Sequence, residues 1–357
     1  MTRCLGPSCT LGALAAALAW LGGCAAAQPG PGKTARLFSR IPTPTAGGTE
    51  LWTDQYFLHD WRIQRRAGTA ECRLLDGYEL QHESGTYDVC LARLEQIQRE
   101  ENLQPKQGKA VILLHGLAAP RWSMHRLGKH LHEQGGYEIV NMQYASTRLS
   151  VDEHAQSLAH VIASLPAFEE INLLGHSMGC IVVRRYLAGE PASENGGWQP
   201  DPRIRRIVMI APPNHGASTA VRLADGSVFK TLFGKPGLQL GKEWDDLQTR
   251  LATPRCEFGI IAGGKGNGKG YSSKLAGDDD GRLEITTTRL AGARDFAVVP
   301  ALHELIGNSS TVFDYTLRFL DEGCFISPEK MQPIYEEGAQ VPEPAEGETR
   351  PVSWWKR

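Results

Sequence analysis

The segment INLLGHSMGCIVV at residues 171–183 constrains the fold of this chain more than any other. Four apolar residues (171–174) precede the pentapeptide GHSMG (175–179), and a second apolar run follows at once. This pattern predicts a buried strand, a sharp turn that presents the serine, and a helix. Glycine at both ends of the turn indicates that the strand and helix backbones approach too closely for a Cβ atom. The helix N-terminus beneath the serine favours negative charge there. Ser177 is therefore the candidate nucleophile.

Strand and helix signals alternate from residue 108 onward. Such alternation predicts an α/β domain with a mostly parallel central sheet and helices on both faces. We expect strands at residues 110–114, 137–142, 171–174, 204–210, 257–262 and 296–299. We expect helices at 123–132, after the capping box Ser150-Val151-Asp152-Glu153, and at 311–320. A hydrophobic content of 41% is ample for a core, and a net charge of −2 argues against nucleic acid as a partner.

Composition divides the chain into five parts, one of which contains an insertion. We expect a signal peptide at 1–23, a Pro/Gly-rich tether at 24–48, a small β-rich extension at 49–107, the α/β domain at 108–326 with an apolar insertion at 217–254, and a disordered Pro/Glu-rich tail at 327–357. The insertion interrupts the strand rhythm. It has two readings of equal weight: a lid or acyl-pocket wall beside the nucleophile, or ordinary core helices that cross the sheet.

The first residues predict export. Arg3 and the apolar stretch 11–21 form a secretory signal that is too short to span a membrane comfortably. Residues 21–24, LGGC, resemble a bacterial lipobox, in which Cys24 is lipidated and becomes the mature N-terminus. That resemblance implies an envelope lipoprotein of the outer membrane that faces the periplasm. Residues 25–27, AAA, offer an ordinary cleavage site instead, which would release a soluble periplasmic or secreted protein.

Five cysteines lie beyond the signal region, and an exported chain can oxidise them. The first expected disulfide joins Cys72 to Cys90, because both lie in one strand-rich segment, and a second joins Cys256 to Cys324. Cys180 follows the serine turn and is expected to be a small buried apolar residue. The chain has no C-x-x-C motif, so neither a zinc site nor a thioredoxin-like site is expected.

A serine hydroxyl is a poor nucleophile at neutral pH and needs a base, which in turn needs an orienting carboxylate. With this strand–turn–helix motif, the acid and then the histidine follow the serine along the chain. His303 is the one histidine downstream of the acid candidates. His215 comes too early and is expected to be structural or to line a pocket.

The acid is expected in the loop after the strand at 257–262. That loop ends in Asp278, Asp279 and Asp280, and all three are candidates. Asp295 immediately precedes the last strand, which would place it at the wrong end of the sheet.

The oxyanion of a tetrahedral intermediate is met by backbone N–H groups. One is expected from Met178, directly after the nucleophile. The second is expected from Leu117, in the loop after the strand at 110–114. Gly116 lets that loop approach the serine, and His115 is expected to hold the loop rather than to transfer protons.

Taken together, these motifs resemble the α/β-hydrolase superfamily, and within it the bacterial lipase and esterase branch. The resemblance is carried by LLHGL at 113–117, GHSMG, APPNHG at 211–216, the turn at 277–281 and His303. It implies hydrolysis of an acyl ester through an acyl-enzyme, with no metal or organic cofactor. It also favours Asp280 as the acid, because Asp280-Gly281 is similar to the acid-bearing turn of bacterial lipases.

Other activities use the same residues. An amidase, a thioesterase or a phospholipase would need the same serine, histidine and acid, because one fold hosts many chemistries. From another class, a noncatalytic envelope lipoprotein could keep the fold as a binding scaffold. The departure from the resemblance is GGKGNGKGYSSKLA at 263–276, which nearly spells a phosphate-binding loop. It lacks the Ser or Thr that binds Mg²⁺, so a flexible basic rim is expected there.

Overall fold

The computed structural model describes residues 43–44, 49–192, 197–216 and 227–336, with no side-chain account for residues 227–233. The predicted signal peptide and tether, with Cys24, lie outside the described residues apart from a two-residue strand at Thr43–Pro44. Residues 217–226 of the insertion and residues 337–357 of the tail also lie outside them. Export, lipidation and tail disorder therefore stay predictions. No helix in the described part of the chain is long and apolar enough to cross a membrane.

The main sheet has six parallel strands in the order β11-β10-β9-β8-β6-β7. The strands are β6 (Gly108–Leu114), β7 (Glu138–Met142), β8 (Phe168–His176), β9 (Ile204–Ile210), β10 (Glu257–Gly264) and β11 (Asp295–Pro300). Along β6, Ile112 and Leu114 join one apolar cluster while Val111 and Leu113 join another. Burial on both faces explains why the segment AVILL of β6 is a continuous apolar run.

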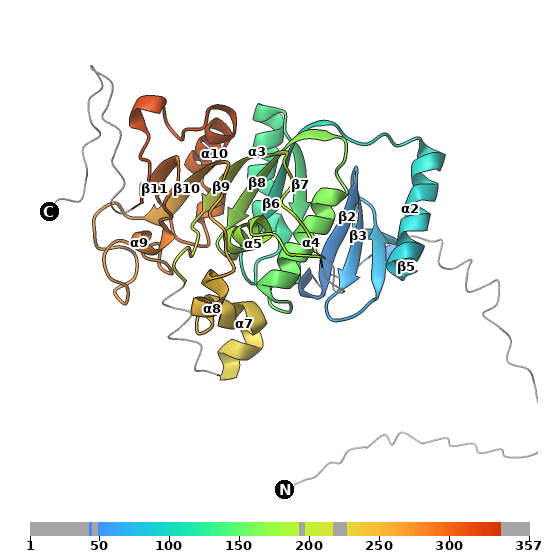
Figure 1. Ribbon diagram of the computed structural model, residues 1–357, viewed down its shortest axis with the longest axis horizontal. Coiled ribbons are helices and arrows are strands. Elements are labelled where there is room, and N and C mark those ends of the chain that lie inside the picture. Colours follow the sequence, from blue (N-terminus) through green and yellow to red (C-terminus); the bar gives the residue numbers. More distant parts are fainter. Residues whose placement is uncertain (1–42, 45–48, 193–196, 217–226, 337–357) are drawn as a thin grey trace, which may run out of the picture. The chain divides into compact units, whose positions relative to one another are not determined.

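Helices cover both faces of this sheet (Figure 1). On one face lie α4 (Val151–Ala163) and α5 (Met178–Leu187); on the other lie α3 (His125–Gly135) and α10 (Ser310–Glu322). Shorter elements are η2 (Arg121–Met124), α9 (Ile285–Thr288), η3 (Ile306–Asn308) and η4 (Pro328–Lys330). The expected parallel sheet with helices on both faces is confirmed.

The N-terminal extension is a second, antiparallel sheet in the order β1-β5-β4-β3-β2. Its elements are β1 (Thr43–Pro44), η1 (Thr49–Leu51), β2 (Trp52–Leu58), β3 (Trp61–Arg66), β4 (Cys72–Leu75), β5 (Leu80–Gly85) and the helix α2 (Tyr87–Glu101). Leu94 and Ile97 of α2 pack with Ile63 and Leu74 of the sheet in a small core of their own. The expected β-rich extension is confirmed. Its strand β2 lies against α4, with a hydrogen bond from Asp54 N to Gln143 O just beyond β7.

The two expected disulfides are absent from the structure. Cys72 and Cys90 lie in one apolar cluster but carry free thiols, and Cys256 and Cys324 are free as well. Burial, the largest cause, raises the pKa of Cys90 to about 12, so that thiol is protonated and unreactive. Cys180 is fully buried, as expected of a small apolar residue.

The described part of the insertion packs as core. It contains α7 (Ser227–Leu240), kinked at Gly234, and α8 (Trp244–Gln248). Leu240, Trp244 and Leu247 are buried in the cluster beneath α4 and α5. These three residues belong to the core, and a lid or acyl-pocket wall formed by the insertion stays a prediction.

The folded chain extends further than the tail boundary predicted at residue 327. Ile334 N donates to Ala293 O at 2.9 Å, and Gln332 N donates to the Asp295 carboxylate at 2.8 Å. Residues 327–336 therefore belong to the α/β domain, because they hydrogen-bond to the start of β11. The start of a disordered tail at residue 327 is thus too early.

Candidate active site

Ser177 lies in the turn between β8 and α5, in a strained backbone conformation. Its φ and ψ are 53° and −121°, in a region that non-glycine residues rarely adopt. Two backbone hydrogen bonds hold it there: Ser177 N donates to Ile210 O at 2.8 Å, and Cys180 N donates to Ser177 O at 3.0 Å. Such a conformation costs about 1–3 kcal/mol and persists only where the surrounding structure enforces it.

The two glycines of GHSMG let the backbones meet around Ser177. A Cβ atom on Gly175 would lie 2.5 Å from Cys180 N, and one on Gly179 would collide with the carbonyl of Leu114 at the end of β6. Both obstacles are backbone atoms, which cannot rotate away. The close approach inferred from the sequence is therefore present in the structure.

The structure brings Ser177, His303 and Asp280 into one hydrogen-bonded chain. His303 Nε2 lies 2.9 Å from Ser177 Oγ, and His303 Nδ1 lies 2.7 Å from Asp280 Oδ2. Because a carboxylate accepts, Nδ1 carries the proton and Nε2 faces the serine hydroxyl as an acceptor. The three residues come from the turn after β8, the loop after β10 and the loop after β11, all at the carboxyl end of the sheet.

The Asp280 carboxylate is held by the backbone of its own turn. Its Oδ1 accepts hydrogen bonds from Arg282 N at 2.9 Å and Leu283 N at 2.7 Å, which leaves Oδ2 for His303. His303 N in turn donates to Asp280 O at 2.9 Å. Asp280 is 1% exposed, so the carboxylate meets the imidazole away from solvent.

The neighbouring aspartates bind the Gly/Lys loop instead of His303. The Asp278 carboxylate accepts from Lys265 N at 2.7 Å and Gly266 N at 2.6 Å. Asp279 Oδ1 accepts from Tyr271 N, Ser272 N and Gly281 N, at 3.2, 2.9 and 2.6 Å. Four backbone amides of this loop, those of Lys265, Gly266, Tyr271 and Ser272, are thus used by carboxylates of the same chain.

Asp295 lies at the other end of the sheet, as the sequence predicted. Its carboxylate accepts backbone N–H groups of Phe296 and Phe325 at 2.8 and 2.7 Å. It stabilises the start of β11 and the chain after α10.

The HGLA loop, residues 115–118 after β6, runs against the serine. A Cβ atom on Gly116 would lie 3.3 Å from Ser177 Cβ, in a contact that only glycine makes without displacement. Leu117 and Met178, the expected oxyanion donors, lie in this loop and at the first position of α5. Within the described residues, neither backbone N–H has a hydrogen-bond acceptor.

Two buried histidines beside the site, His115 and His176, are in the neutral form. Burial lowers the pKa of His115 to about 4, and its Nδ1 lies 2.9 Å from Gly116 O. His115 also stacks on Tyr144 with ring centroids 4.1 Å apart. His115 is thus bound within the loop, as expected from the sequence.

His176, which no sequence motif marked as a site residue, also contacts His303. The pKa of His176 is lowered to about 3, mainly by burial. Its Nε2 lies 3.0 Å from His303 O, a group that only accepts, so Nε2 carries the proton. His176 thereby fixes the backbone of His303. The only available signal was its place directly before the serine.

His215 is exposed in the loop after β9, and its backbone N donates to Thr287 O at 3.1 Å. It takes no part in the hydrogen-bonded chain. Among the residues that the structure describes, no group of three or more His, Cys, Asp or Glu could hold a metal ion.

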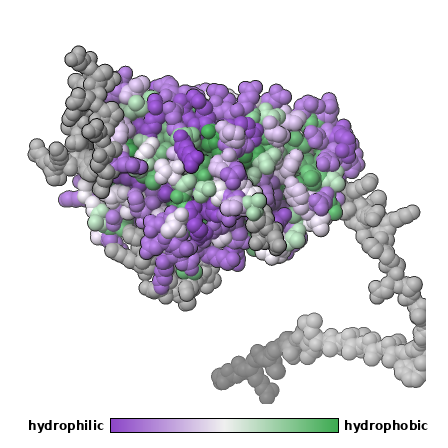
Figure 2. Space-filling view, viewed as in Figure 1, coloured by the Kyte–Doolittle hydropathy of each residue, from purple (hydrophilic) through white to green (hydrophobic). Residues whose placement is uncertain are grey.

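Three exposed apolar side chains lie on the segments that carry the site. Trp122 of η2, just after the HGLA loop, is 71% exposed. Leu302 and Leu305 flank His303 and are 38% and 59% exposed. Elsewhere, on the face drawn in Figure 2, the surface is mostly hydrophilic, with apolar residues in small groups.

The family model described as "Alpha/beta hydrolase family" matches residues 111–339. No curated protein matches the chain in sequence. Similar solved structures include a lipase from Bacillus licheniformis (15% identity, TM-score 0.40), which matches over 59% of this chain and 90% of its own. An esterase from Thermogutta terrifontis shares 14% identity over 60% of this chain and 90% of its own, with a TM-score of 0.39. A lipase-esterase related protein from Clostridium acetobutylicum shares 12% identity over 59% of this chain and 94% of its own, with a TM-score of 0.36.

Proposed function

Because the chain belongs to the α/β hydrolase family, we propose that it is a serine carboxylester hydrolase of the lipase or esterase type. The hydrogen-bonded chain Ser177–His303–Asp280 carries this proposal. It supplies a nucleophile, a base within reach of its proton, and a buried carboxylate that orients the base.

In the proposed reaction, Ser177 Oγ attacks the acyl carbon while His303 Nε2 takes the hydroxyl proton. Asp280 stabilises the imidazolium that forms, and the Leu117 and Met178 amides meet the negative oxygen. His303 then returns the proton to the leaving alcohol, and the acyl-enzyme remains. Water, deprotonated by His303, attacks that ester and releases the carboxylic acid and the free serine.

The exposed apolar side chains of Leu302 and Leu305, on the segment that carries His303, favour an acyl chain as the substrate group. An amidase, a thioesterase or a phospholipase would use the same residues. A series of p-nitrophenyl esters, amides, thioesters and phospholipids of increasing acyl length distinguishes these activities by kcat/KM.

The test of the proposal compares the full chain with Ser177→Ala on p-nitrophenyl butyrate and octanoate. We expect hydrolysis by the wild type and a loss of roughly 10⁴-fold or more in the variant, since the nucleophile is gone. Ser84→Ala, at an exposed position of β5, is the matched control and should keep full activity. A fluorophosphonate should label only proteins that retain Ser177. Equal hydrolysis by the wild type and Ser177→Ala, or no labelling of the wild type, refutes the assignment and favours a noncatalytic scaffold.

A further inference from the structure

The loop between β7 and α4, residues 143–150, lies between the HGLA loop and the N-terminal sheet. We name it the connecting loop. Its residues form hydrogen bonds with the segment that carries Leu117 on one side, and with β2 and η1 on the other. The N-terminal sheet is thus linked to the candidate oxyanion site through one short segment.

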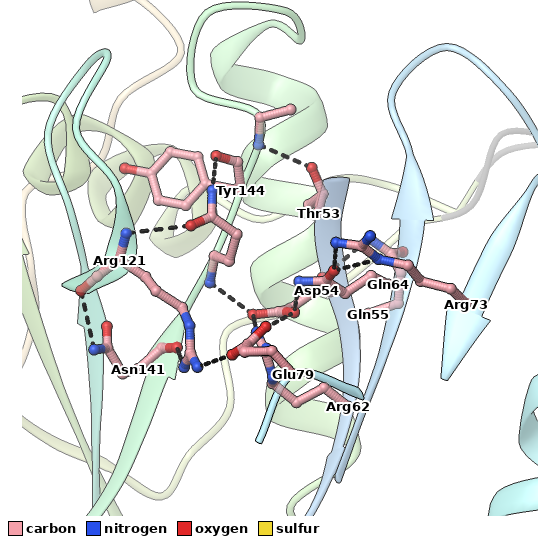
Figure 3. Close-up of polar contacts among 12 residues, drawn as sticks. Thr53, Asp54, Gln55, Arg62, Gln64, Arg73, Glu79, Arg121, Asn141 and Tyr144 are labelled. Atoms are coloured by element: carbon pink, nitrogen blue, oxygen red, sulfur yellow. Dashed lines mark hydrogen bonds and ion pairs between the residues drawn. The ribbon is translucent and has the colours of Figure 1, made fainter. Parts of the chain in front are cut away.

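Three hydrogen bonds join the connecting loop to the chain around Leu117. The Tyr144 hydroxyl donates to His115 O. Ala118 N donates to Ser146 Oγ at 2.9 Å. A third bond, from Arg121 N to Gln143 Oε1 at 3.2 Å, is drawn in Figure 3.

Further hydrogen bonds join the connecting loop to the N-terminal extension, beside the one from Asp54 N to Gln143 O. Gln143 N donates to the Asp54 carboxylate at 2.6 Å, and Ala145 N donates to Thr53 Oγ1 at 3.1 Å (Figure 3). The Ser146 hydroxyl donates to the carboxylate of Glu50 at 3.1 Å.

Ser146 takes part in both sets of bonds. It is fully buried, its hydrogen points to Glu50, and its lone pair accepts the N–H of Ala118. A hydroxyl that donates to a carboxylate becomes a better acceptor, because hydrogen bonds in series polarise one another. Ala118 has a φ of 57°, a left-handed conformation that an alanine adopts only under constraint.

The peptide unit that carries the Leu117 N–H lies between two fixed neighbours. The unit before it is held at its carbonyl by Tyr144, through His115 O. The unit after it is held at its N–H by Ser146, through Ala118 N. Since peptide units are planar, fixing both neighbours restricts the direction of the Leu117 N–H.

From this geometry we infer that Ser146, held by Glu50, is a positioning residue that aims the Leu117 amide at the oxyanion. The inference rests on the proposed function and assigns the N-terminal sheet a part in it. The oxyanion forms only as the transition state is reached. A misaligned Leu117 N–H therefore lowers kcat and leaves substrate binding intact.

The test uses the full chain and measures kcat and KM on p-nitrophenyl butyrate. Ser146→Ala should lower kcat about tenfold with KM within about twofold, less than the 10²–10³-fold that removal of an oxyanion donor costs. A trifluoromethyl ketone, whose serine adduct bears an oxyanion, should bind more weakly by the same factor.

Glu50 provides a second test at a half-buried position. Glu50→Ala should lower kcat a few-fold, while Glu50→Gln, which keeps an acceptor oxygen, should restore most of it. Thr147→Val is the matched control: Thr147 Oγ1 donates to the same carboxylate at 2.8 Å but does not bond to the HGLA loop. Its kcat should equal that of the wild type.

The double variant Ser146→Ala/Glu50→Ala should be no slower than Ser146→Ala alone, because both act through one bond. A wild-type kcat in Ser146→Ala, or losses that multiply in the double variant, overturns the inference. Neither result bears on the proposed function, which Ser177→Ala tests separately. If Ser146→Ala does not fold, the Glu50→Ala and Glu50→Gln pair decides.

Discussion

At the scale of single residues, three consecutive aspartates have three different partners. Asp278 and Asp279 each bind backbone amides of the Gly/Lys loop, whereas Asp280 meets the His303 imidazole. A difference of one position along the turn changes the direction of the side chain. The residues are therefore not interchangeable, although they are chemically identical.

We predict that the three alanine variants separate into two classes. Asp280→Ala should lower kcat roughly 10³- to 10⁴-fold, because the imidazole loses both its orientation and its counter-charge. Asp278→Ala and Asp279→Ala should instead lower the melting temperature and keep kcat within about tenfold. Ester hydrolysis and thermal unfolding on the same preparations measure both effects. A loss of kcat in Asp279→Ala equal to that in Asp280→Ala would contradict the assignment.

At the scale of elements, the N-terminal sheet is attached through a buried charge. The Asp54 carboxylate has no solvent exposure and accepts from Gln143 N at 2.6 Å, Gln64 Nε2 at 2.8 Å and Arg62 at 3.3 Å. Arg62 is itself 3% exposed. Removing one partner of a buried pair leaves an uncompensated charge.

We predict that Asp54→Ala lowers the free energy of unfolding by about 3 kcal/mol or more, in part because Arg62 stays buried without this partner. Glu71→Ala is the control on the same sheet. Its ion pair with Arg66 is half exposed, and its loss should cost no more than about 0.5 kcal/mol. Urea unfolding followed by tryptophan fluorescence gives both values. Equal effects would show that the sheet is not attached through Asp54.

How much the sequence predicts depends on whether the information is local. The strand at 204–210 is predicted to the residue, since burial of its last four residues on both faces of the sheet leaves the apolar run IVMI. The order of serine, acid and histidine selects Ser177 and His303 and narrows the acid to three consecutive aspartates, and the resemblance to the acid-bearing turn of bacterial lipases favours Asp280. Ser146, Glu50 and His176 carry no local pattern. Their contacts arise only when segments far apart in sequence pack together, as Glu50 and Ser146 do across 96 positions.

At the scale of the whole molecule, three buried histidines tie stability to pH. The pKa of His115 is lowered to about 4, and the pKa values of His154 and His176 are lowered to about 3. Burial is the largest cause in all three. In the unfolded chain these groups titrate near 6.5, so below that pH the unfolded state binds more protons. Their burial therefore has no proton-linked cost above pH 6.5, and the free energy of unfolding falls as the pH drops toward 4.

We predict a loss of up to about 1.4 kcal/mol per pH unit for each histidine in that window. His154→Leu should reduce the slope of the unfolding free energy against pH by the contribution of one histidine. His125→Leu, at an exposed position, should leave that slope unchanged. Urea titrations at pH 7.5, 6.0 and 5.0 measure the slope. An unchanged slope in His154→Leu would refute this account.

The strained backbone at Ser177 has a consequence for how such a chain can change over time. Glycine adopts a positive φ without penalty, so the residue that best suits this turn is not the one that bears a hydroxyl. A selection for thermal robustness alone would favour glycine at position 177 and erase the proposed chemistry. At position 177, thermal stability and the proposed catalytic activity therefore favour different residues.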